Sequence, residues 1–464
     1  MESAALFWND AALEANKEDH NGMPPDAGGP VFSARALAIV HAAMADAHAA
    51  ARLAGGGTPT FAPFYTSAAP TRAVPPGAAL AGAAHTALSA IFARQTATFD
   101  AKLAAFSADL IAAGEDGSAV DEGFRFGRTV ADAILGLRAN DGTSDPTNGN
   151  AASPYKPGGL PGLHDADPLN PNQGFYAWHY GRAAPFVLAR DEMLEALPPP
   201  PPQLHEARYL DDYVEVFNKG RREGGTRTPE ETEVGIFWAY DGTKKLGTPP
   251  RFYNQIIRKV GEADCLDEDQ WVALLAQANL ALADAGAVAW HAKYLYNVWR
   301  PIIGIRRHVA VSDRPDADRD PTWEPLGAPA SNRTNQGPNA PMDAPGHDFT
   351  PPFPAYPSGH ATFGAAAFTV LREFRARRMA GDPDTIDIDV VSDEFNGETT
   401  DAAGNPRAPV TRHYDSIETM VTENLESRVF LGVHWRFDGV GGRDSGTKVG
   451  QRVADRAYVL PATA

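Results

Sequence analysis

Apolar and small residues recur at the spacing of an α-helix along most of the chain. In the first half this pattern covers residues 33–47, 78–113 and 118–137, and we expect one break within the second of these stretches. In the second half it covers residues 204–218, 229–238, 250–260, 267–299, 361–374 and 415–430, and it resumes after Trp435. Few stretches alternate with the period of two that marks a β-strand. The pattern therefore predicts an all-α protein.

A run of five prolines divides the chain into two parts. Residues 198–202 are all proline, which makes this segment stiff and extended, and an amphipathic helix is expected directly after it. We therefore predict two packed helical bundles, an N-terminal one over residues 1–202 and a C-terminal one over residues 203–464.

Two segments of the second half are rich in acidic residues. Residues 306–352 contain Asp313 and three further aspartates up to Asp320, but the segment lacks the terminal glutamate of a calcium-binding loop. We interpret it as a solvated surface loop, with a calcium site as the less favoured alternative. Residues 382–405 receive the same interpretation.

The net charge of the chain limits the kinds of macromolecule that it can bind. The 464 residues include 41 Lys and Arg against 59 Asp and Glu, which gives a formal net charge of −18 at pH 7. This field repels nucleic acid and anionic membranes, so we expect neither as a partner. We find no basic leader and no uninterrupted apolar run of membrane-spanning length. We predict a soluble protein, cytoplasmic or secreted by a route that the sequence does not reveal, and either a monomer or a homodimer.

The chain contains a single cysteine, Cys265. One cysteine rules out an intramolecular disulfide and any metal site made of several cysteines. We expect Cys265 to be a small buried residue.

The most informative stretch is the proline-rich approach to Ser358, Gly359 and His360. Prolines hold the approach extended and the helical pattern begins directly after it, so Ser358 is expected to cap a helix. A helix start offers unpaired N–H groups and a partial positive charge, which favour an anion. Gly359 lets a ligand approach the main chain, and His360 can move a proton beside it. Taken alone, the stretch is better explained by an ordinary cap followed by a core histidine.

Two cations precede this stretch. Lys293 and Arg300 lie seven residues apart in what we expect to be one long helix, so both would project from the same face. The planar guanidinium of Arg300, in the last turn before Pro301, suits bidentate contact with an oxyanion. A solvated basic stripe is the simpler explanation if the pair stands alone.

A third stretch combines an arginine, a histidine and an aspartate. Arg428 ends one predicted helix, Gly432 permits a sharp break, and His434 opens the next helix. Asp438 follows four residues later, where its carboxylate can accept a hydrogen bond from His434 and fix its tautomer. Such an imidazole suits a metal ligand or a nucleophile. The alternative is a surface histidine satisfied by a nearby carboxylate.

Taken in order, these three stretches resemble the signature shared by vanadium-dependent haloperoxidases and the type 2 phosphatidic acid phosphatase superfamily. The flanks favour the haloperoxidases, because they are similar to segments of fungal and bacterial vanadium chloroperoxidases at residues 240–242, 248–255, 353–364 and 431–438. Residues 6–9 and 33–37 match as well, so the resemblance spans nearly the whole chain. It implies two helical bundles with the active site at the end of the C-terminal bundle.

The resemblance also implies roles for individual residues. Vanadate would be bound through His434 as its single protein ligand, and His360 would act as acid and base. The vanadate oxygens would be held by Lys293, Arg300, Ser358, Gly359 and Arg428. Lys293 would in addition polarise the hydrogen peroxide that the family uses as oxidant. An imidazole ligand among several cationic donors suits vanadium(V) acting as a Lewis acid.

Three further residues match positions around the halide site of the family. Asp241 is similar to a carboxylate that pairs with the arginine matching Arg428, and Trp290 and Phe353 match residues near the halide. In bromide-selective relatives a histidine commonly stands at this position, so the resemblance implies that Phe353 favours chloride as well as bromide. The implied reaction is the oxidation of halide by hydrogen peroxide to hypohalous acid, which halogenates a small organic substrate.

Two other functions remain open from the sequence. An acid phosphatase of the same superfamily would use His434 as a nucleophile that forms a phosphohistidine, with His360 as the acid for the leaving group. A phosphate or vanadate binding protein without turnover would need neither acid nor base. The length of the chain disfavours the phosphatase, and the paired histidines disfavour the simple binder.

Overall fold

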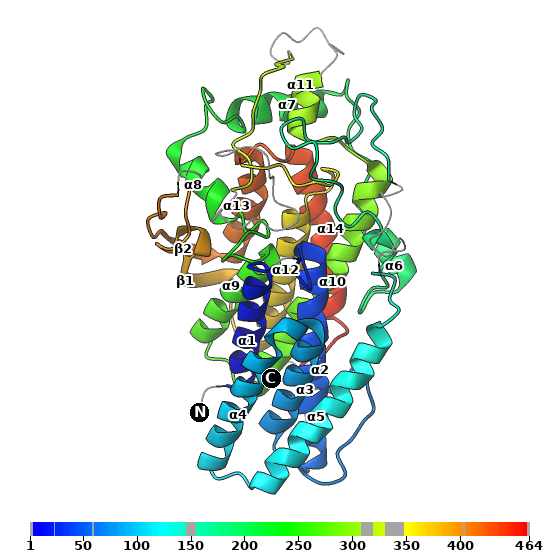
Figure 1. Cartoon of the computed structure of the whole chain (residues 1–464), viewed down its shortest axis with the longest axis vertical. Coiled ribbons are helices and arrows are strands. Elements are labelled where there is room, and N and C mark those ends of the chain that lie inside the picture. The colour runs from blue at the N-terminus through cyan, green and yellow to red at the C-terminus, as the bar shows by residue number, and fades with distance from the viewer. Residues whose placement is uncertain are drawn as a thin grey trace.

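Helices dominate the computed structural model of the chain, which describes residues 3–22, 24–57, 60–144, 155–307, 319–329, 348–401 and 404–461. The first five helices are α1 (Ala4–Asp19), α2 (Pro30–Ala54), α3 (Pro76–Ile91), α4 (Thr96–Ala112) and α5 (Gly117–Arg138). In Figure 1, α2 to α5 make up the lower half of an elongated molecule. The expected break between residues 78 and 113 is confirmed, because the chain bends by 119° between α3 and α4.

The remaining helices form the centre and the upper half. They are α6 (Arg190–Glu195), α7 (Ala207–Lys219), α8 (Pro229–Phe237), α9 (Pro249–Ala263), α10 (Glu268–Tyr296), α11 (Pro301–Arg307), α12 (Gly359–Arg378), α13 (Ile417–Phe430) and α14 (Arg436–Ala454). Every helix predicted for the second half is present, with ends close to the expected positions.

The long helix α10 runs through the centre and packs against α2, α12 and α14. Asp267 caps it by accepting from the Gln270 N–H at 2.9 Å, and Gln270 accepts from the Asp267 N–H at 3.0 Å. Within the described residues, α10 is the one single helix that is long enough, and on average apolar enough, to cross a membrane, although Gln277, Asn279 and Asp284 interrupt its apolar run. That apolar stretch is entirely buried inside the protein, as in a core helix.

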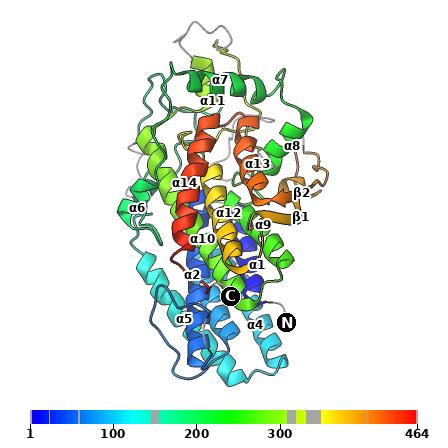
Figure 2. The same ribbon diagram turned by 180° about the vertical axis from the view of Figure 1, so that it is seen from behind.

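Three glycines set the close contact between α12 and α14. A Cβ on Gly442, Gly446 or Gly450 would lie 2.6, 2.2 or 2.5 Å from a carbonyl oxygen of α12 or its cap. These glycines recur every four residues, so they form one row on the face of α14. The two helices therefore run side by side (Figure 2), which holds the start of α12 next to the start of α14.

The interpretation of residues 382–405 as a solvated loop is wrong in part. β1 (Thr385–Val391) and β2 (Thr411–Ser416) pair as an antiparallel hairpin. The side chains of β1 alternate strictly between exposed and buried, with Ile386 and Ile388 among the buried ones. This period-two pattern was present in the sequence over a short stretch. The all-α fold class is confirmed, because the hairpin is the one sheet in the described part of the chain.

Cys265 is exposed, contrary to the expectation that it is buried. It lies in the turn between α9 and α10 and has a positive φ of 54°. The chain reverses at the surface here, so the thiol is not part of the core.

The aspartate cluster lies mostly outside the described residues, which include Asp320 but not Asp313 or its close neighbours. Asp320 accepts from the Thr322 hydroxyl at 2.7 Å and pairs with Arg221 at 3.2 Å. The calcium alternative and the domain boundary at residue 202 both stay predictions.

Candidate active site

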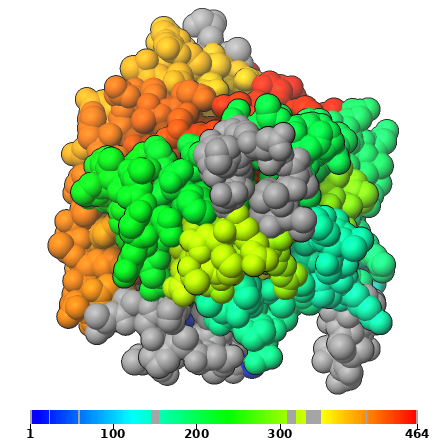
Figure 3. Space-filling model, turned by 90° about the horizontal axis from the view of Figure 1, so that it is seen from above, coloured from blue at the N-terminus to red at the C-terminus, as the bar shows by residue number. Residues whose placement is uncertain are grey.

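Several chain segments converge in the upper half of the molecule. They are the C-terminal end of α10, the start of α11, the start of α12, the turn between α13 and α14, and residues 239–241 after α8. Helix α7 packs against α11, α13 and α14. Figure 3 shows this end of the molecule from above, with the region of α7 and α8 in green and residues 155–189 in teal.

The start of α12 has the geometry that the sequence predicts. Ser358 is extended (φ −65°, ψ 123°), and its Oγ accepts from the Ala361 N–H at 3.4 Å, so it caps the helix. The Ser358 N–H donates to the Asp438 carbonyl at 2.8 Å, which fixes the cap against α14. A Cβ on Gly359 would lie 3.3 Å from the Trp290 ring, so glycine lets the indole pack on the helix start.

Lys293 is fully buried, and its ammonium group has three backbone partners. Nζ donates to the carbonyls of Pro354 at 2.9 Å, Ala355 at 3.1 Å and Pro357 at 2.6 Å. Burial lowers the pKa of Lys293 well below its usual range, and the Arg300 guanidinium lowers it further. Lys293 therefore holds the extended approach to the start of α12 in place.

Lys293 and Arg300 do not share a helix, contrary to the prediction. α10 ends at Tyr296, and Asn297 follows in the left-handed conformation (φ 54°, ψ 40°). Pro301 begins α11, and a residue before proline avoids helical geometry, so Arg300 precedes a new helix and does not end the long one. The two cations are brought together by this break and not by helical spacing.

The Arg300 guanidinium is fully buried and uses only part of its donor capacity. Nε donates to the Phe353 carbonyl at 2.8 Å, and Nη1 donates to the Val433 carbonyl at 2.8 Å and to His434 Nε2 at 2.9 Å. Nη2 has no hydrogen-bond partner among the described residues. Burial lowers the pKa of Arg300, which reflects the free-energy cost of a desolvated cation.

Arg428 is a second buried guanidinium with unused donors. Its Nη2 binds both carboxylate oxygens of Asp241 at 3.0 Å, as the resemblance implied. Nε and Nη1 have no partner in the part of the chain that the structure describes. An unpaired buried N–H costs about 1–3 kcal/mol, and more on a charged group, so these nitrogens mark a place for an anion.

His434 and Asp438 pair as predicted. His434 Nδ1 lies 2.9 Å from Asp438 Oδ2, which also accepts from the Trp435 N–H at 2.9 Å. Because arginine can only donate, His434 Nε2 accepts from Arg300 and Nδ1 carries the hydrogen. Burial and the Arg300 charge lower the pKa of His434 well below its usual range. The neutral imidazole thus presents the Nε2 lone pair, which is the form that binds a metal.

His360 faces a backbone carbonyl. Its Nε2 lies 2.6 Å from the Ala239 oxygen and 3.9 Å from Asp241 Oδ1. A carbonyl can only accept, so Nε2 carries the hydrogen and Nδ1 is the nitrogen that can take up a proton. Burial and the Arg428 charge lower the pKa of His360 well below its usual range, which favours the neutral imidazole at pH 7.

Trp290 and Phe353 form an aromatic wall next to the cations. Their ring centroids are 4.9 Å apart. Lys293 Nζ lies 5.0 Å, and the guanidinium carbon of Arg300 4.8 Å, from the centre of the Phe353 ring. Trp290 Nε1 is buried and has no partner within the described ranges. An apolar wall with one unused N–H beside fixed cations suits a small anion.

Sequence reasoning missed the groups that hold His360. Tyr253 Oη and Asn424 Nδ2 both donate to the His360 carbonyl, at 3.0 and 2.9 Å. Asn424 lies one helical turn before Arg428 on α13, and this spacing could have drawn attention to it. The Ala239 carbonyl that faces the imidazole leaves no signal in the sequence, because every residue has a carbonyl.

The arrangement fits an oxyanion bound to one imidazole. Arg300, Lys293 and Arg428 all lower the pKa of His434, so three cations lie close enough to act on it. Among the residues that the structure describes, no group of three or more His, Cys, Asp or Glu side chains could hold a metal cation. An imidazole surrounded by cationic donors fits an oxyanion such as vanadate or phosphate.

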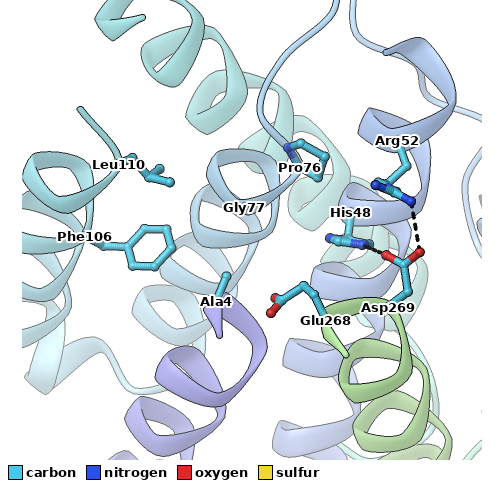
Figure 4. Close-up of a pocket in the computed structure, with 9 residues that line it drawn as sticks. All are labelled: Ala4, His48, Arg52, Pro76, Gly77, Phe106, Leu110, Glu268 and Asp269. Atoms are coloured by element: carbon cyan, nitrogen blue, oxygen red, sulfur yellow. Dashed lines mark hydrogen bonds and ion pairs between the residues drawn. The ribbon is translucent and has the colours of Figure 1, made fainter. Parts of the chain in front are cut away.

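A separate cavity lies in the lower half of the molecule (Figure 4). Its volume is about 280 Å³, and its wall includes His48, Arg52 and Asp269. His48 Nε2 lies 2.6 Å from Asp269 Oδ1, and Arg52 Nη2 lies 3.3 Å from Oδ2, so these polar groups pair with one another. The contacts tie α2 to the start of α10 and belong to the fold.

Family models match both ends of the chain. The vanadium chloroperoxidase N-terminal domain matches residues 2–174, and the VCPO second helical-bundle domain matches residues 273–460. The chain is also 34% identical to the vanadium chloroperoxidase of Curvularia inaequalis over an alignment of 503 residues, which covers 95% of this chain and 79% of that enzyme.

Two solved structures share the fold. A bacterial vanadium-dependent iodoperoxidase matches with a TM-score of 0.70 and 21% identity, over 98% of this chain and 97% of that one. A holo-type bacterial vanadium-dependent chloroperoxidase matches with a TM-score of 0.63 and 15% identity, over 95% of each chain. Since sequence identity, family models and donor geometry agree, the chain belongs to the vanadium chloroperoxidase family and is a vanadate-dependent haloperoxidase.

Proposed function

We propose that this enzyme oxidises chloride or bromide with hydrogen peroxide to hypohalous acid, which halogenates small organic molecules. The observation that carries the proposal is the set of unused N–H donors on two fully buried guanidinium groups, Arg300 and Arg428, beside a neutral His434. Such groups cost free energy unless an anion binds them.

Vanadate would be held by this site through His434 Nε2. The vanadate oxygens would be bound by Arg300, Arg428, the Ser358 hydroxyl and the Gly359 N–H. When bound, vanadium(V) supplies a Lewis acid that activates hydrogen peroxide without a change in oxidation state. Asp438 keeps His434 in the tautomer that exposes Nε2. Binding at Nε2 replaces the Arg300 N–H that this nitrogen now accepts.

His360 is the acid and base of the proposal. Its Nδ1 takes the proton that hydrogen peroxide must lose, while Nε2–H stays on the Ala239 carbonyl. The lowered pKa of His360 keeps this base unprotonated at neutral pH, which is the state that can accept a proton. The same imidazole then returns the proton to the product.

The role proposed for Lys293 is electrostatic. Its ammonium hydrogens already bind three carbonyls of residues 354–357, so direct contact with an oxyanion requires one of these bonds to break. Three carbonyl acceptors need the three hydrogens of an ammonium group, so we assign a positive charge to Lys293 despite its lowered pKa. This charge polarises the peroxide, and the three bonds hold the approach to Ser358 in place.

The halide is proposed to meet the site at the aromatic wall of Trp290 and Phe353. The Lys293 and Arg300 charges lie within about 5 Å of the Phe353 ring, where they can attract a halide that the apolar wall partly desolvates. One relative is a chloroperoxidase and one protein with this fold is an iodoperoxidase, so iodide belongs in the test beside chloride and bromide.

The test begins with protein freed of bound oxyanions and reconstituted with orthovanadate. Halogenation of a cyclic dione reporter is measured with hydrogen peroxide and each halide in turn, and hydrolysis of an aryl phosphate is measured in parallel without vanadate. We expect vanadate-dependent halogenation with chloride or bromide. Phosphate hydrolysis without halogenation would instead support a phosphatase with His434 as nucleophile, and inactivity in both assays would support a binding protein.

A further inference from the structure

Residues 237–241 carry two groups of the site on one short segment. The Ala239 carbonyl accepts from His360 Nε2 at 2.6 Å, and Asp241 accepts from Arg428 at 3.0 Å. Tyr240, the residue between them, has a positive φ of 44°. A bulky residue rarely adopts this left-handed conformation, so surrounding contacts must hold it there. Those contacts decide where both groups point.

Glu394 is the side chain that reaches the Tyr240 backbone. Its Oε1 accepts from the Tyr240 N–H at 3.2 Å, and its Oε2 accepts from Arg407 Nη1 at 2.9 Å. Glu394 is completely buried. A buried carboxylate is tolerated only when it is paired and hydrogen-bonded, and here a guanidinium and a strained backbone N–H share it.

The region after β1 holds the same segment at two more points. Glu394 lies in the short 3-10 helix η5 (Asp393–Phe395), which follows β1. Ser392 Oγ donates to the Phe237 carbonyl at 2.7 Å, and the Asp393 N–H donates to the Tyr240 hydroxyl at 2.7 Å. In Figure 1 the hairpin lies on the flank of the molecule beside α8 and α9. The small sheet thus anchors the loop that follows α8.

We propose that Glu394 is a positioning residue of the active site. It fixes the Tyr240 backbone, and this aims the Ala239 carbonyl at His360 and the Asp241 carboxylate at Arg428. The inference rests on the proposed function for its activity readout, whereas oxyanion binding and backbone protection test it independently.

Two substitutions separate the length of the Glu394 side chain from its charge. Glu394→Asp keeps the charge that pairs with Arg407, but the shorter side chain moves the carboxylate away from the Tyr240 N–H. Glu394→Gln keeps the side-chain length and one acceptor oxygen but loses the charge. The matched control is Glu192→Asp, because Glu192 also accepts from a backbone N–H, that of Ala189 at 2.9 Å, and from an arginine, Arg456, at 2.6 Å.

Three quantities are measured for each variant. They are hydrogen–deuterium exchange of the peptide over residues 237–243, vanadate affinity by equilibrium dialysis, and kcat and KM for bromide. We expect Glu394→Asp to speed exchange at Tyr240 and to lower both vanadate affinity and kcat by about 10–100-fold, as is usual for partners that orient metal-site residues. Glu394→Gln should recover most of this loss, and Glu192→Asp should leave all three quantities unchanged.

Normal exchange and normal vanadate affinity in Glu394→Asp would overturn the proposal. A Glu394→Gln variant impaired as much as Glu394→Asp would also overturn it, because charge and not reach would then matter. Equal losses in Glu192→Asp would mean that the effect is general destabilisation, which would overturn the proposal as well. If the wild type binds vanadate without oxidising halide, and Glu394→Asp still weakens that binding, the proposed function fails and the positioning role stands.

Discussion

At the scale of single residues, the candidate active site holds buried positive charge that the described side chains do not fully neutralise. Arg300 and Arg428 are fully buried, yet three of their nitrogens have no partner among the described residues. Asp241 pairs with only one of the two guanidinium groups. Desolvated and uncompensated cations destabilise a folded protein, so a bound oxyanion stabilises this one.

Replacing His434 and His360 one at a time should affect vanadate binding and catalytic turnover separately. His434→Ala should abolish vanadate retention, because it removes the nitrogen that we propose as the metal ligand. His360→Ala should retain vanadate and lower kcat by about 10²–10⁴-fold, the usual contribution of a general acid and base. Equilibrium dialysis and steady-state rates measure the two effects. Unchanged vanadate affinity in His434→Ala would refute the ligand assignment.

Replacing Asp438 by asparagine should weaken vanadate binding without unfolding the protein. Asp438→Asn keeps an oxygen for the Trp435 N–H, but it replaces the ionisable carboxyl group beside His434 Nδ1 by a neutral amide, which polarises the imidazole less. The expected loss of vanadate affinity is about 10–100-fold. Dialysis against graded vanadate measures it, with the thermal unfolding midpoint as the control. Wild-type affinity in this variant would show that the carboxylate does not prepare the ligand.

At the scale of elements, the breaks between helices bring the site together. α10 ends at Tyr296 and is followed by Asn297 with φ 54°, and Gly432 has φ 70° in the turn from α13 to α14. The first break separates Arg300 from α10 and places it next to His434. The second break lets His434 lie just before α14, four residues ahead of Asp438, where the two side chains pair.

Sequence reasoning predicted most helices and the local pairs, because these depend on spacing over a few residues. The Ser358 cap and the contact of His434 with Asp438 are examples. The prediction of one helix over residues 267–299 was wrong at its end, because α10 stops at Tyr296 and the left-handed Asn297 follows. Asparagine at such a position has no strong sequence signature. Sequence reasoning also could not predict that Glu394 contacts Tyr240, because the two residues are 154 positions apart and no periodic pattern links them.

Gly432→Ala should disrupt the turn between α13 and α14. A Cβ at this position would lie 2.4 Å from the Gly220 carbonyl oxygen, and the backbone is left-handed. We expect a loss of about 2–5 kcal/mol in the free energy of unfolding, from about 1–2 for the backbone and 1–3 for the overlap. Urea unfolding measures this loss.

Gly56→Ala is the matched control for this substitution. Gly56 also has a positive φ, of 74°, but nothing described lies within 4 Å of its added Cβ. It should lose only the backbone contribution of about 1–2 kcal/mol. Equal losses in the two variants would mean that the crossing with Gly220 is not tightly packed.

At the scale of the whole molecule, α10 joins the two halves of the chain. It packs on α2 of the first half and on α12 and α14 of the second. One apolar cluster includes residues from α1 to α5 together with residues of α10, α12 and α14. Asp284 of α10 accepts from the Phe186, Val187 and Leu188 N–H groups, which ties the long loop before α6 to this helix. The frame of the site thus depends on both halves.

Asp284 should make stability fall as pH rises from about 4 to 6. Burial raises the pKa of Asp284 in the folded protein to about 6, above its ordinary value of 3.8. The folded state therefore binds more protons than the unfolded state in this window, so ionisation on raising the pH favours unfolding. Asp284→Asn removes this contribution. Urea midpoints of wild type and variant should thus differ by an amount that changes between pH 4 and 6; parallel midpoints would contradict the assignment.

The central claim is that one vanadate, bound through His434 among buried cations, makes this chain a haloperoxidase. Its most direct test is a titration of oxyanion-free protein with vanadate while bromide-dependent halogenation by hydrogen peroxide is followed. The rate should saturate at one vanadate per chain and should vanish in His434→Ala. Halogenation that is independent of vanadate, or that survives in His434→Ala, would contradict the claim.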